Sequence, residues 1–325
     1  MRNLSIKALL AATLAVVLAS VHAAEVFPAK PIKIIVPIAA GGATDVQARA
    51  MADELQKRLK SPVVVENKPG GNFVIGNVAV ATAPPDGYTI GWALSAAMAL
   101  NPLLYKNLPY KPEDFQFLAP VSKGHHVIAV PNTVKANTLA EWISEIKSSG
   151  RPAAIGVSSL GGTTHLMSEE IGELANFTVE PVVYRGEAPA VLDLVAGQLP
   201  AMSGIVASVL DHYKAGKVKI LAISSEKRIP ELPNVPTFKE QGYDFVATYW
   251  NGVVAPAGTP KPIVDKLSSA IREVVASPEY KARISASVPD MHLIIGSPKL
   301  MAEMIKDDTV FWGRIIKNRN IKVDN

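Results

Sequence analysis

The stretch IKIIVPIAAGGATDVQAR, residues Ile32–Arg49, passes from an apolar run through a pair of glycines into a helical pattern. The branched residues Ile34–Val36 predict a buried strand. Apolar residues then recur at the spacing of one helix face, at Val46, Ala50, Met51 and Leu55. The stretch therefore predicts a strand, a tight turn and a helix, with Thr44 or Asp45 as the helix cap.

The glycine turn at Gly41–Gly42 suits a bound anion. Glycines allow a sharp turn and bring backbone N–H groups close to a guest, and a helix start carries about +0.5 charge with unpaired donors. The turn matches neither G-x-G-x-x-G nor G-x-x-x-x-G-K-[ST], and no lysine follows it to neutralise a phosphate chain. A plain strand-to-helix connection explains the turn equally well, so its role stays open at this point.

The N-terminal residues carry the pattern of a secretory signal peptide. Arg2 and Lys7 are basic, an apolar run covers residues 9–21, and Val21 and Ala23 place small side chains where signal peptidase reads. The run is shorter than the about 20 residues that a membrane span needs. Residues 1–23 are therefore predicted to be a cleaved signal peptide, which leaves the mature protein in the periplasm.

The composition argues against several kinds of site. The chain has no cysteine, which removes disulfides, Cys-based metal sites, a Cys nucleophile and a lipid-modified N-terminal Cys. Removing Arg2 and Lys7 from the 33 basic residues leaves 31 against 29 acidic ones, and the absence of a basic cluster argues against nucleic-acid binding. His125 and His126 are adjacent and would point to opposite sides of a strand, so no metal site is predicted there. No cofactor is predicted either.

A second stretch, RPAAIGVSSLGGTTHLMSEEIGEL, repeats the first theme. A short apolar strand at Ala154–Val157 leads into Gly161–Gly162 and a helix. Strand-like and helix-like runs alternate along the chain, which is typical of α/β proteins with a largely parallel sheet, and the length favours two lobes. Two such helix starts facing one another would hold one or two carboxylates without a fixed positive side chain.

Seven motifs carry a resemblance to a known family: PIKIIVPIAAGGATDVQARAMADEL, VVVENKPGGNFVIG, ATAPPDGYTI, SSLGGTTHL, VVYRGEAPAVLDLVAGQ, AISSEKRIPELPNVPTFKEQGYDF and WNGVVAPAGTPKPIVDKL. In this order they resemble the Bug-type, TctC-like periplasmic solute receptors of tripartite tricarboxylate transporters. The similarity covers the mature chain from Pro28 to about Val323.

This resemblance implies an α/β Venus-flytrap fold, with a mostly parallel sheet in each of two lobes and a hinge between them. The first lobe would comprise residues 24–126 and 249–325, and the second lobe, inserted into the first, residues 127–248. The chain would cross between the lobes near Gly124–Val127 and near Tyr249–Gly252.

The resemblance also implies that a ligand carboxylate is held between the two glycine turns by backbone amides, hydroxyls and bridging water. The implied ligand-binding residues of the first lobe are Ile38, Ala40, Gly41, Gly42, Ala43, Thr44 and Ser95. Those of the second lobe are Ser158, Gly161, Gly162, Thr163, Thr164, Tyr184, Arg185, Gly186 and Ser203.

Three positions depart from the family pattern. Ile38 stands where an aromatic residue is frequent, Arg185 where Lys is frequent, and Pro200 where Asp is usual. A different pocket wall is therefore expected. Arg185 would either pair with a distal carboxylate of the ligand or brace the lobe from outside.

The favoured function is a monomeric periplasmic binding protein, not an enzyme, that delivers a small organic acid to the membrane subunits of a tripartite tricarboxylate transporter. The acid would be a mono-, di- or tricarboxylate, aliphatic or aromatic. A ligand sensor for a signalling partner would look the same in sequence. A serine hydrolase is a third alternative, because GVSSL at residues 156–160 is close to the G-x-S-x-G nucleophile elbow and His165 follows Ser158 closely.

Overall fold

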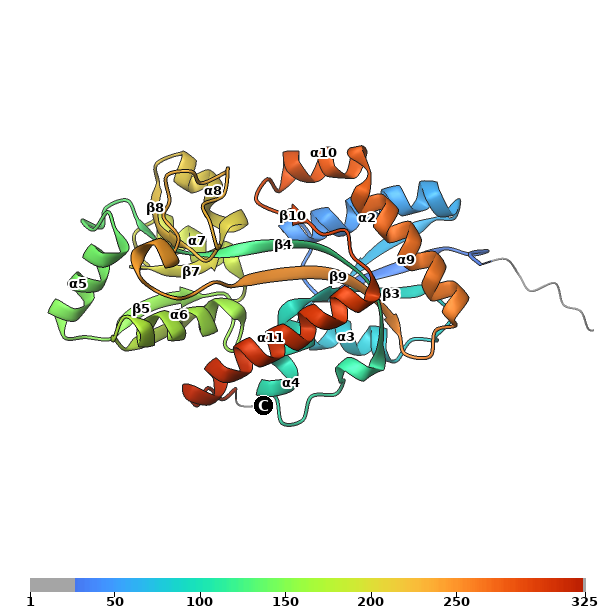
Figure 1. The fold of residues 1–325 in the computed structure, drawn as a ribbon, viewed down its shortest axis with the longest axis horizontal. Coiled ribbons are helices and arrows are strands. Elements are labelled where there is room, and N and C mark those ends of the chain that lie inside the picture. The colour runs from blue at the N-terminus through green and yellow to red at the C-terminus, as the bar shows by residue number, and fades with distance from the viewer. Residues whose placement is uncertain (1–26, 324–325) are drawn as a thin grey trace, which may run out of the picture.

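The computed structural model describes residues 27–323, which form two lobes side by side along the long axis of the molecule (Figure 1). Each lobe has a β-sheet with helices packed against it. The two-lobed α/β architecture predicted from the sequence is confirmed. The predicted signal peptide lies outside the described residues.

The first lobe is built on strand β1 (Ile32–Val36), which pairs in parallel with β2 (Val63–Asn67) and β3 (Thr89–Leu94). Alternate side chains of β1 enter cores on opposite faces of the sheet, as strand geometry requires. Ile34 packs in one apolar cluster and Ile35 in another. The helices of this lobe include α2 (Ala43–Leu59), α3 (Val74–Ala81), α9 (Lys261–Ala276) and α10 (Pro278–Ser287).

The second lobe repeats this arrangement around β5 (Ala153–Val157), which pairs in parallel with β6 (Val179–Val183) and β7 (Met202–Ile205). Ile155 packs with Leu166 in the core of this lobe. The remaining strand and helices of the lobe are β8 (Val218–Ile223), α5 (Leu139–Ser149), α6 (Thr163–Leu174), α7 (Glu187–Val195) and α8 (Val206–Lys214).

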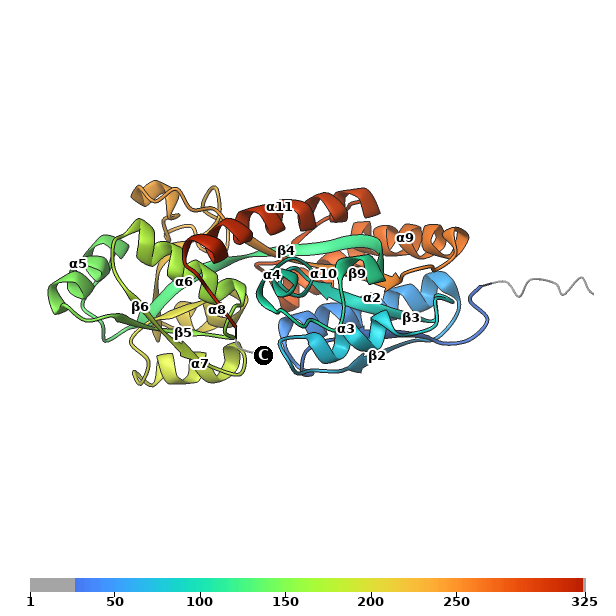
Figure 2. The same cartoon turned by 90° about the horizontal axis from the view of Figure 1, so that it is seen from below.

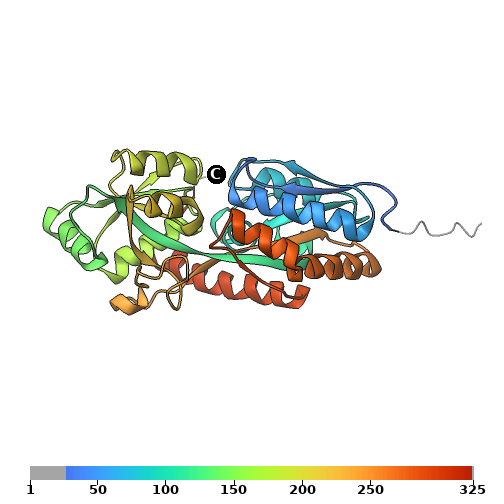
Figure 3. The ribbon, with the colours of Figure 1, turned by 90° about the horizontal axis from the view of Figure 1, so that it is seen from above.

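Strand β4 (Phe115–Pro131) belongs to both sheets and joins the lobes, as the green ribbon in Figure 3 shows. From Phe115 to His125 it pairs with β9 (Thr248–Pro256), and from His126 onward it pairs with β7 and β8. The predicted lobe boundaries fall inside β4 and at the start of β9, and the division itself stays a prediction. All antiparallel pairings involve β4 or β9, so each sheet is mixed, with the parallel strands to one side.

Helix α11 (Pro298–Asn318) also runs from one lobe to the other beside β4 (Figure 2), a connection that the sequence did not predict. Its first half packs Met301 into a core of the first lobe, and its second half packs Trp312 into the core of the second lobe. Arg314 of α11 forms an ion pair with Glu170 of α6 at 3.0 Å. Within residues 27–323, two strands and one helix therefore connect the lobes.

Short elements complete the described chain. They are a π-helix at Ala96–Leu100, α4 (Asn101–Leu104), 3-10 turns at Pro112–Asp114 and Lys239–Gln241, and β10 (His292–Leu293). Within residues 27–323, no helix combines the length and the apolar character that crossing a bilayer requires.

Candidate ligand-binding site

The two glycine turns have the same backbone geometry. Gly41 has a φ of 94° and Gly42 lies before α2 with φ and ψ of −81° and 169°. Gly161 has a φ of 73° and Gly162 lies before α6 with φ and ψ of −73° and 168°. A positive φ favours glycine, so the first glycine of each pair has a conformational role. The repeat seen in the sequence is therefore a repeat in structure.

The predicted side-chain caps are wrong. Gly42 and Gly162 occupy the N-cap positions, and neither helix start has a side-chain cap hydrogen bond. Thr44 and Asp45 lie inside the first turn of α2 instead. The first N–H groups of a helix have no partner within the helix. Both turns therefore present backbone donors that no capping side chain occupies.

Asp45 faces back toward its own turn rather than capping the helix. Its carboxylate accepts hydrogen bonds from Gly41 N–H at 3.0 Å, Arg49 Nε at 2.8 Å and Asn67 Nδ2 at 2.8 Å. Burial acts to raise the pKa of Asp45, but these hydrogen bonds outweigh it and hold the pKa below its usual value. The carboxylate therefore stays ionised and neutralises Arg49, which leaves the turn without a free cation of its own.

His165 takes the corresponding position in the second turn. Its Nδ1 accepts a hydrogen bond from Gly161 N–H at 3.1 Å, as Asp45 does from Gly41. This bond gives His165 a structural role in the turn. The Ser158 hydroxyl lies 3.1 Å from the Thr164 hydroxyl, and no hydrogen bond joins Ser158 to His165 among the described residues. The pair thus lacks the nucleophile–base contact of a hydrolase.

Hydroxyl groups gather around the second turn. Ser158 N–H donates to Thr164 Oγ1 at 3.3 Å, and the Ser203 hydroxyl donates to the Thr164 carbonyl at 2.6 Å. His126 Nε2 and the Thr163 hydroxyl are hydrogen-bonded at 2.9 Å. Burial lowers the pKa of His126 to about 3, so its ring is neutral. The crossing strand β4 is thereby linked to the start of α6.

The segment Tyr184–Gly186 lies beside this turn because its backbone is bonded to the end of β5. Tyr184 N–H donates to the Val157 carbonyl at 2.9 Å and Gly186 N–H to the Ser158 carbonyl at 3.0 Å. The Tyr184 hydroxyl, however, donates to Asp193 on α7 at 2.8 Å. Arg185 is exposed and forms no ion pair within the described part of the chain. Both roles considered for Arg185 therefore remain predictions.

The other first-lobe positions differ in exposure. Ala40, Gly41 and Gly42 are exposed, while Ile38 packs against the lobe core. Ser95 is only 2% exposed, and its hydroxyl accepts from Trp250 N–H at 3.4 Å. Ser95 is thus tied to strand β9. The structure brings the predicted residues of each lobe together around its own glycine turn, apart from Ser95 and the Tyr184 hydroxyl.

Two segments that the predicted division assigns to the first lobe reach the second turn. A Cβ built on Gly161 would lie 2.8 Å from Leu104 Cδ1 of α4 and 2.8 Å from Val323 Cγ2. Glycine is required there for space as well as for φ. The second turn therefore packs against α4 and the C-terminal segment of the described chain.

Sequence reasoning missed one charged residue of this region, Glu187. It is the first residue of α7, directly after Gly186. Its Oε2 accepts from the Ser208 hydroxyl at 3.0 Å and from Ile205 N–H at 3.4 Å. Burial raises the pKa of Glu187 to about 7, although hydrogen bonds from Ser158, Ser208 and Ile205 oppose the shift. The acidic residue after the YRG turn was its only signal in the sequence.

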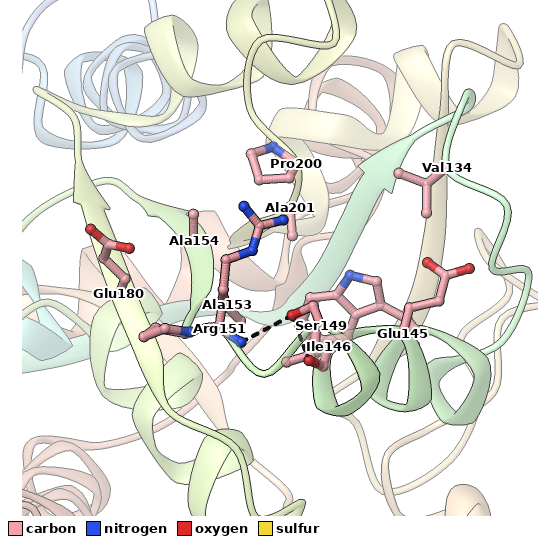
Figure 4. Close-up of a pocket in the computed structure, with 12 residues that line it drawn as sticks. Val134, Glu145, Ile146, Ser149, Arg151, Ala153, Ala154, Glu180, Pro200 and Ala201 are labelled. Carbon is pink, nitrogen blue, oxygen red and sulfur yellow. Dashed lines mark hydrogen bonds between the residues drawn. The ribbon is translucent and has the colours of Figure 1, made fainter.

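A separate cavity of about 540 Å³ lies on the outer side of the second lobe, between α5 and the strands β5 and β6 (Figure 4). Its lining includes Trp142, Arg151, Glu180 and Pro200. None of the predicted ligand-binding residues lines it. Pro200, which was expected to change the wall of the ligand pocket, contributes to this outer cavity instead. Within residues 27–323, no cluster of His, Asp or Glu is arranged to hold a metal ion.

The sequence matches the model of the TctC family, the tripartite tricarboxylate transporter family receptors, over residues 47–321. The chain belongs to this family. A relative in Bordetella pertussis, protein BugT, is 34% identical over 304 residues, which cover 92% of each chain.

Solved structures of this receptor family share the fold. Rpa4515 from R. palustris, solved with adipate, has a TM-score of 0.85 at 28% identity and is covered over 99% of its length by 91% of this chain. MatC from Rhodopseudomonas palustris, solved with bound malate, has a TM-score of 0.80 at 26% identity, with 89% of this chain covering 100% of that one. Both of those proteins were therefore solved with dicarboxylates.

Proposed function

We propose that this receptor holds a small carboxylate between its two glycine turns. The observation that carries the proposal is the matching geometry of the turns, each of which ends in a helix start without a side-chain cap. In this arrangement the N–H groups of Ala43 and Thr44 face one end of the ligand carboxylate, and those of Thr163 and Thr164 face the other. The adipate and malate bound by the relatives support this ligand class.

The physical chemistry of the turns suits such a ligand. An anion at a helix start gains about 0.3–2 kcal/mol from the helix dipole, and charge-assisted hydrogen bonds are stronger than neutral ones. The hydroxyls of Ser158, Thr163 and Thr164 add donors beside the second turn. Arg185 is exposed and adjoins Gly186, whose N–H is bonded to the Ser158 carbonyl beside the second turn. There it would meet a second carboxylate group of a longer ligand.

Export and delivery complete the proposal. The signal peptide directs the chain to the periplasm, where it acts as a monomer without lipid anchor and without chemically changing its ligand. It then hands the acid to the membrane subunits of a tripartite tricarboxylate transporter. Mass spectrometry of the periplasmic fraction tests the cleavage near Ala23, and a mature chain that retained Met1 would contradict it.

The ligand class is tested by thermal unfolding of refolded protein with a panel of metabolites. A ligand that binds only the folded state stabilises it by about 4 kcal/mol at about 1,000 times its dissociation constant. Mono- or dicarboxylates should raise the unfolding temperature, while sugars and nucleotides should not. Refolding first removes any acid that co-purifies. A response to sugars or nucleotides with no response to any carboxylate would overturn the proposal.

A further inference from the structure

A carboxyl group stands inside the second-lobe half of the proposed anion site. Glu187 follows Gly186, whose N–H donates to the carbonyl of Ser158 at 3.0 Å. Its Oε2 would lie 3.1 Å from a Cβ on Gly204, the neighbour of Ser203. The carboxyl group also takes a hydrogen bond from Ser158, one of the residues assigned to ligand binding. The residue as a whole keeps part of its surface exposed.

This carboxyl group lacks a cationic partner. Its bonding partners are the hydroxyls of Ser158 and Ser208 and the backbone N–H of Ile205, and it forms no ion pair with a Lys, Arg or His of residues 27–323. Burial raises its pKa to about 7 because those neutral donors do not compensate for lost solvation. A plain carboxylate ligand placed beside it would add like-charge repulsion.

We propose that Glu187 makes this site select acids that also carry an amino group, so that the helix starts hold the ligand carboxylate while its ammonium group pairs with Glu187. This inference rests on the carboxylate function proposed above. A dicarboxylate of the same carbon skeleton without the amino group binds only when Glu187 is protonated. Selectivity between the two kinds of acid is thereby set by one side chain.

The proposal predicts opposite pH dependences for the two kinds of ligand. An ammonium group stabilises the ionised form of Glu187, so binding lowers its pKa and the affinity rises with pH through 7. A plain acid stabilises the protonated form, so binding raises its pKa and the affinity falls with pH. A pKa change of about two units gives an about tenfold change in affinity between pH 6 and pH 8 in each direction.

Other titratable groups near Glu187 are few among the described residues. Tyr249 on β9 feels the charge of Glu187, but burial is the main cause that raises the pKa of Tyr249 well above its usual value, so Tyr249 stays neutral in this range. Beyond Tyr249, burial raises the pKa of Asp290 to about 6. His126 on β4 meets the Tyr249 ring edge to face and stays neutral. From α8, Ser208 reaches the carboxyl group, and it does not titrate.

Calorimetry with matched ligand pairs tests the inference. The probes are succinate against aspartate and adipate against 2-aminoadipate, at pH 6 and pH 8. The proteins are the wild type, the variant Glu187→Gln and the control Glu180→Gln, which changes an exposed residue of the outer cavity. The wild type and the control should prefer the aminated acids at pH 8 and show the opposite slopes. Glu187→Gln should lose both slopes and shift the preference toward the plain acids by about tenfold or more.

The outcomes separate this inference from the function on which it rests. Equal pH slopes for both members of each pair in the wild type would overturn the role of Glu187 while leaving carboxylate binding in place. A folded Glu187→Gln variant that keeps the wild-type preference for aminated acids would also overturn the role of Glu187. Binding of neither kind of acid would overturn the carboxylate function itself. If Glu187→Gln does not fold, the wild-type slopes alone decide.

Discussion

Replacing Gly42 with Asp should raise the stability of the protein and lower its affinity for a carboxylate. Gly42 has a φ of −81°, which any residue adopts, and a Cβ at this position meets no atom within 4 Å. Asp is a preferred N-cap residue, and its carboxylate would accept from the N–H groups of Thr44 or Asp45. The N–H of Thr44 is one of the donors proposed for the ligand, and the added carboxylate would lie beside the other, that of Ala43. The same hydrogen bond therefore stabilises the helix and blocks the site.

The two effects have different sizes. Asp in place of Gly at an N-cap gains a few tenths of a kcal/mol from capping and about 0.3–1 kcal/mol from the helix dipole. The carboxylate of Asp45, which is bonded to Gly41 N–H, opposes the second term. The net gain is about 0.5 kcal/mol, or about 1–2 °C in unfolding temperature for a chain of this size. Affinity should fall at least tenfold, which is about 1.4 kcal/mol or more.

Thermal unfolding followed by circular dichroism measures the first effect, and calorimetry with a carboxylate ligand measures the second. Gly42→Ala controls for the added Cβ, and Gly42→Asn caps the helix without a charge. We expect Gly42→Ala to bind within about threefold of the wild type and Gly42→Asn to be intermediate. A folded Gly42→Asp variant with wild-type affinity would refute the assignment of these donors to the ligand. An equal loss in Gly42→Ala would assign the effect to bulk alone.

Three further predictions concern stability and motion. The Asp308 carboxyl group accepts a hydrogen bond from Trp250 Nε1 at 2.7 Å, and burial raises the pKa of Asp308 from 3.8 to about 7. The contribution of Asp308 to the free energy of unfolding is therefore complete below about pH 4 and is lost as pH rises toward 7. Asp308→Asn should flatten that fall in unfolding temperature between pH 4.5 and pH 8, and an unchanged profile would contradict the shift. In urea unfolding, Gly161→Ala should lower the free energy of unfolding by about 1 kcal/mol or more beyond the loss in Gly41→Ala. Both glycines have positive φ, but only a Cβ at Gly161 meets other atoms. Equal losses in the two variants would show that the neighbouring side chains move aside without cost. Small-angle scattering should show a smaller radius of gyration with ligand, because the three connecting segments permit hinge closure, and no change at saturation would indicate a rigid site.

The glycine turns could be predicted because their signals are local. A run of branched residues, two glycines and a helical period fix a strand, a turn and a helix within a few residues of each other. The caps could not be predicted in this way, because the fate of Asp45 depends on Asn67 of β2 and on Arg49 one turn further along α2. These partners draw its carboxylate away from the helix start. Local capping preference is overridden by a contact that is distant in sequence.

Helix α11 shows a second limit of the sequence. Its apolar positions indicate an amphipathic helix, but the pattern does not say which lobe each position enters. Met301 belongs to one core and Trp312 to another, three turns later. The length of β4 was likewise hidden, since one part of this strand pairs in the sheet of the first lobe and the other part in the sheet of the second lobe. Connections between lobes depend on tertiary packing that periodicity does not encode.

The distribution of charge around the two turns argues that specificity comes from beside the donors rather than from the donors themselves. Backbone N–H groups at a helix start accept any carboxylate of suitable size, because they read only the anionic oxygens. Arg49 is neutralised by Asp45, and Arg314 by Glu170, so neither cation is left to select a ligand. The side chains that remain are Arg185, which is exposed, and Glu187, which lacks a cationic partner among the described residues. They flank Gly186 with opposite charges. This pair would therefore select ligands by the spacing between the second carboxylate and the amino group.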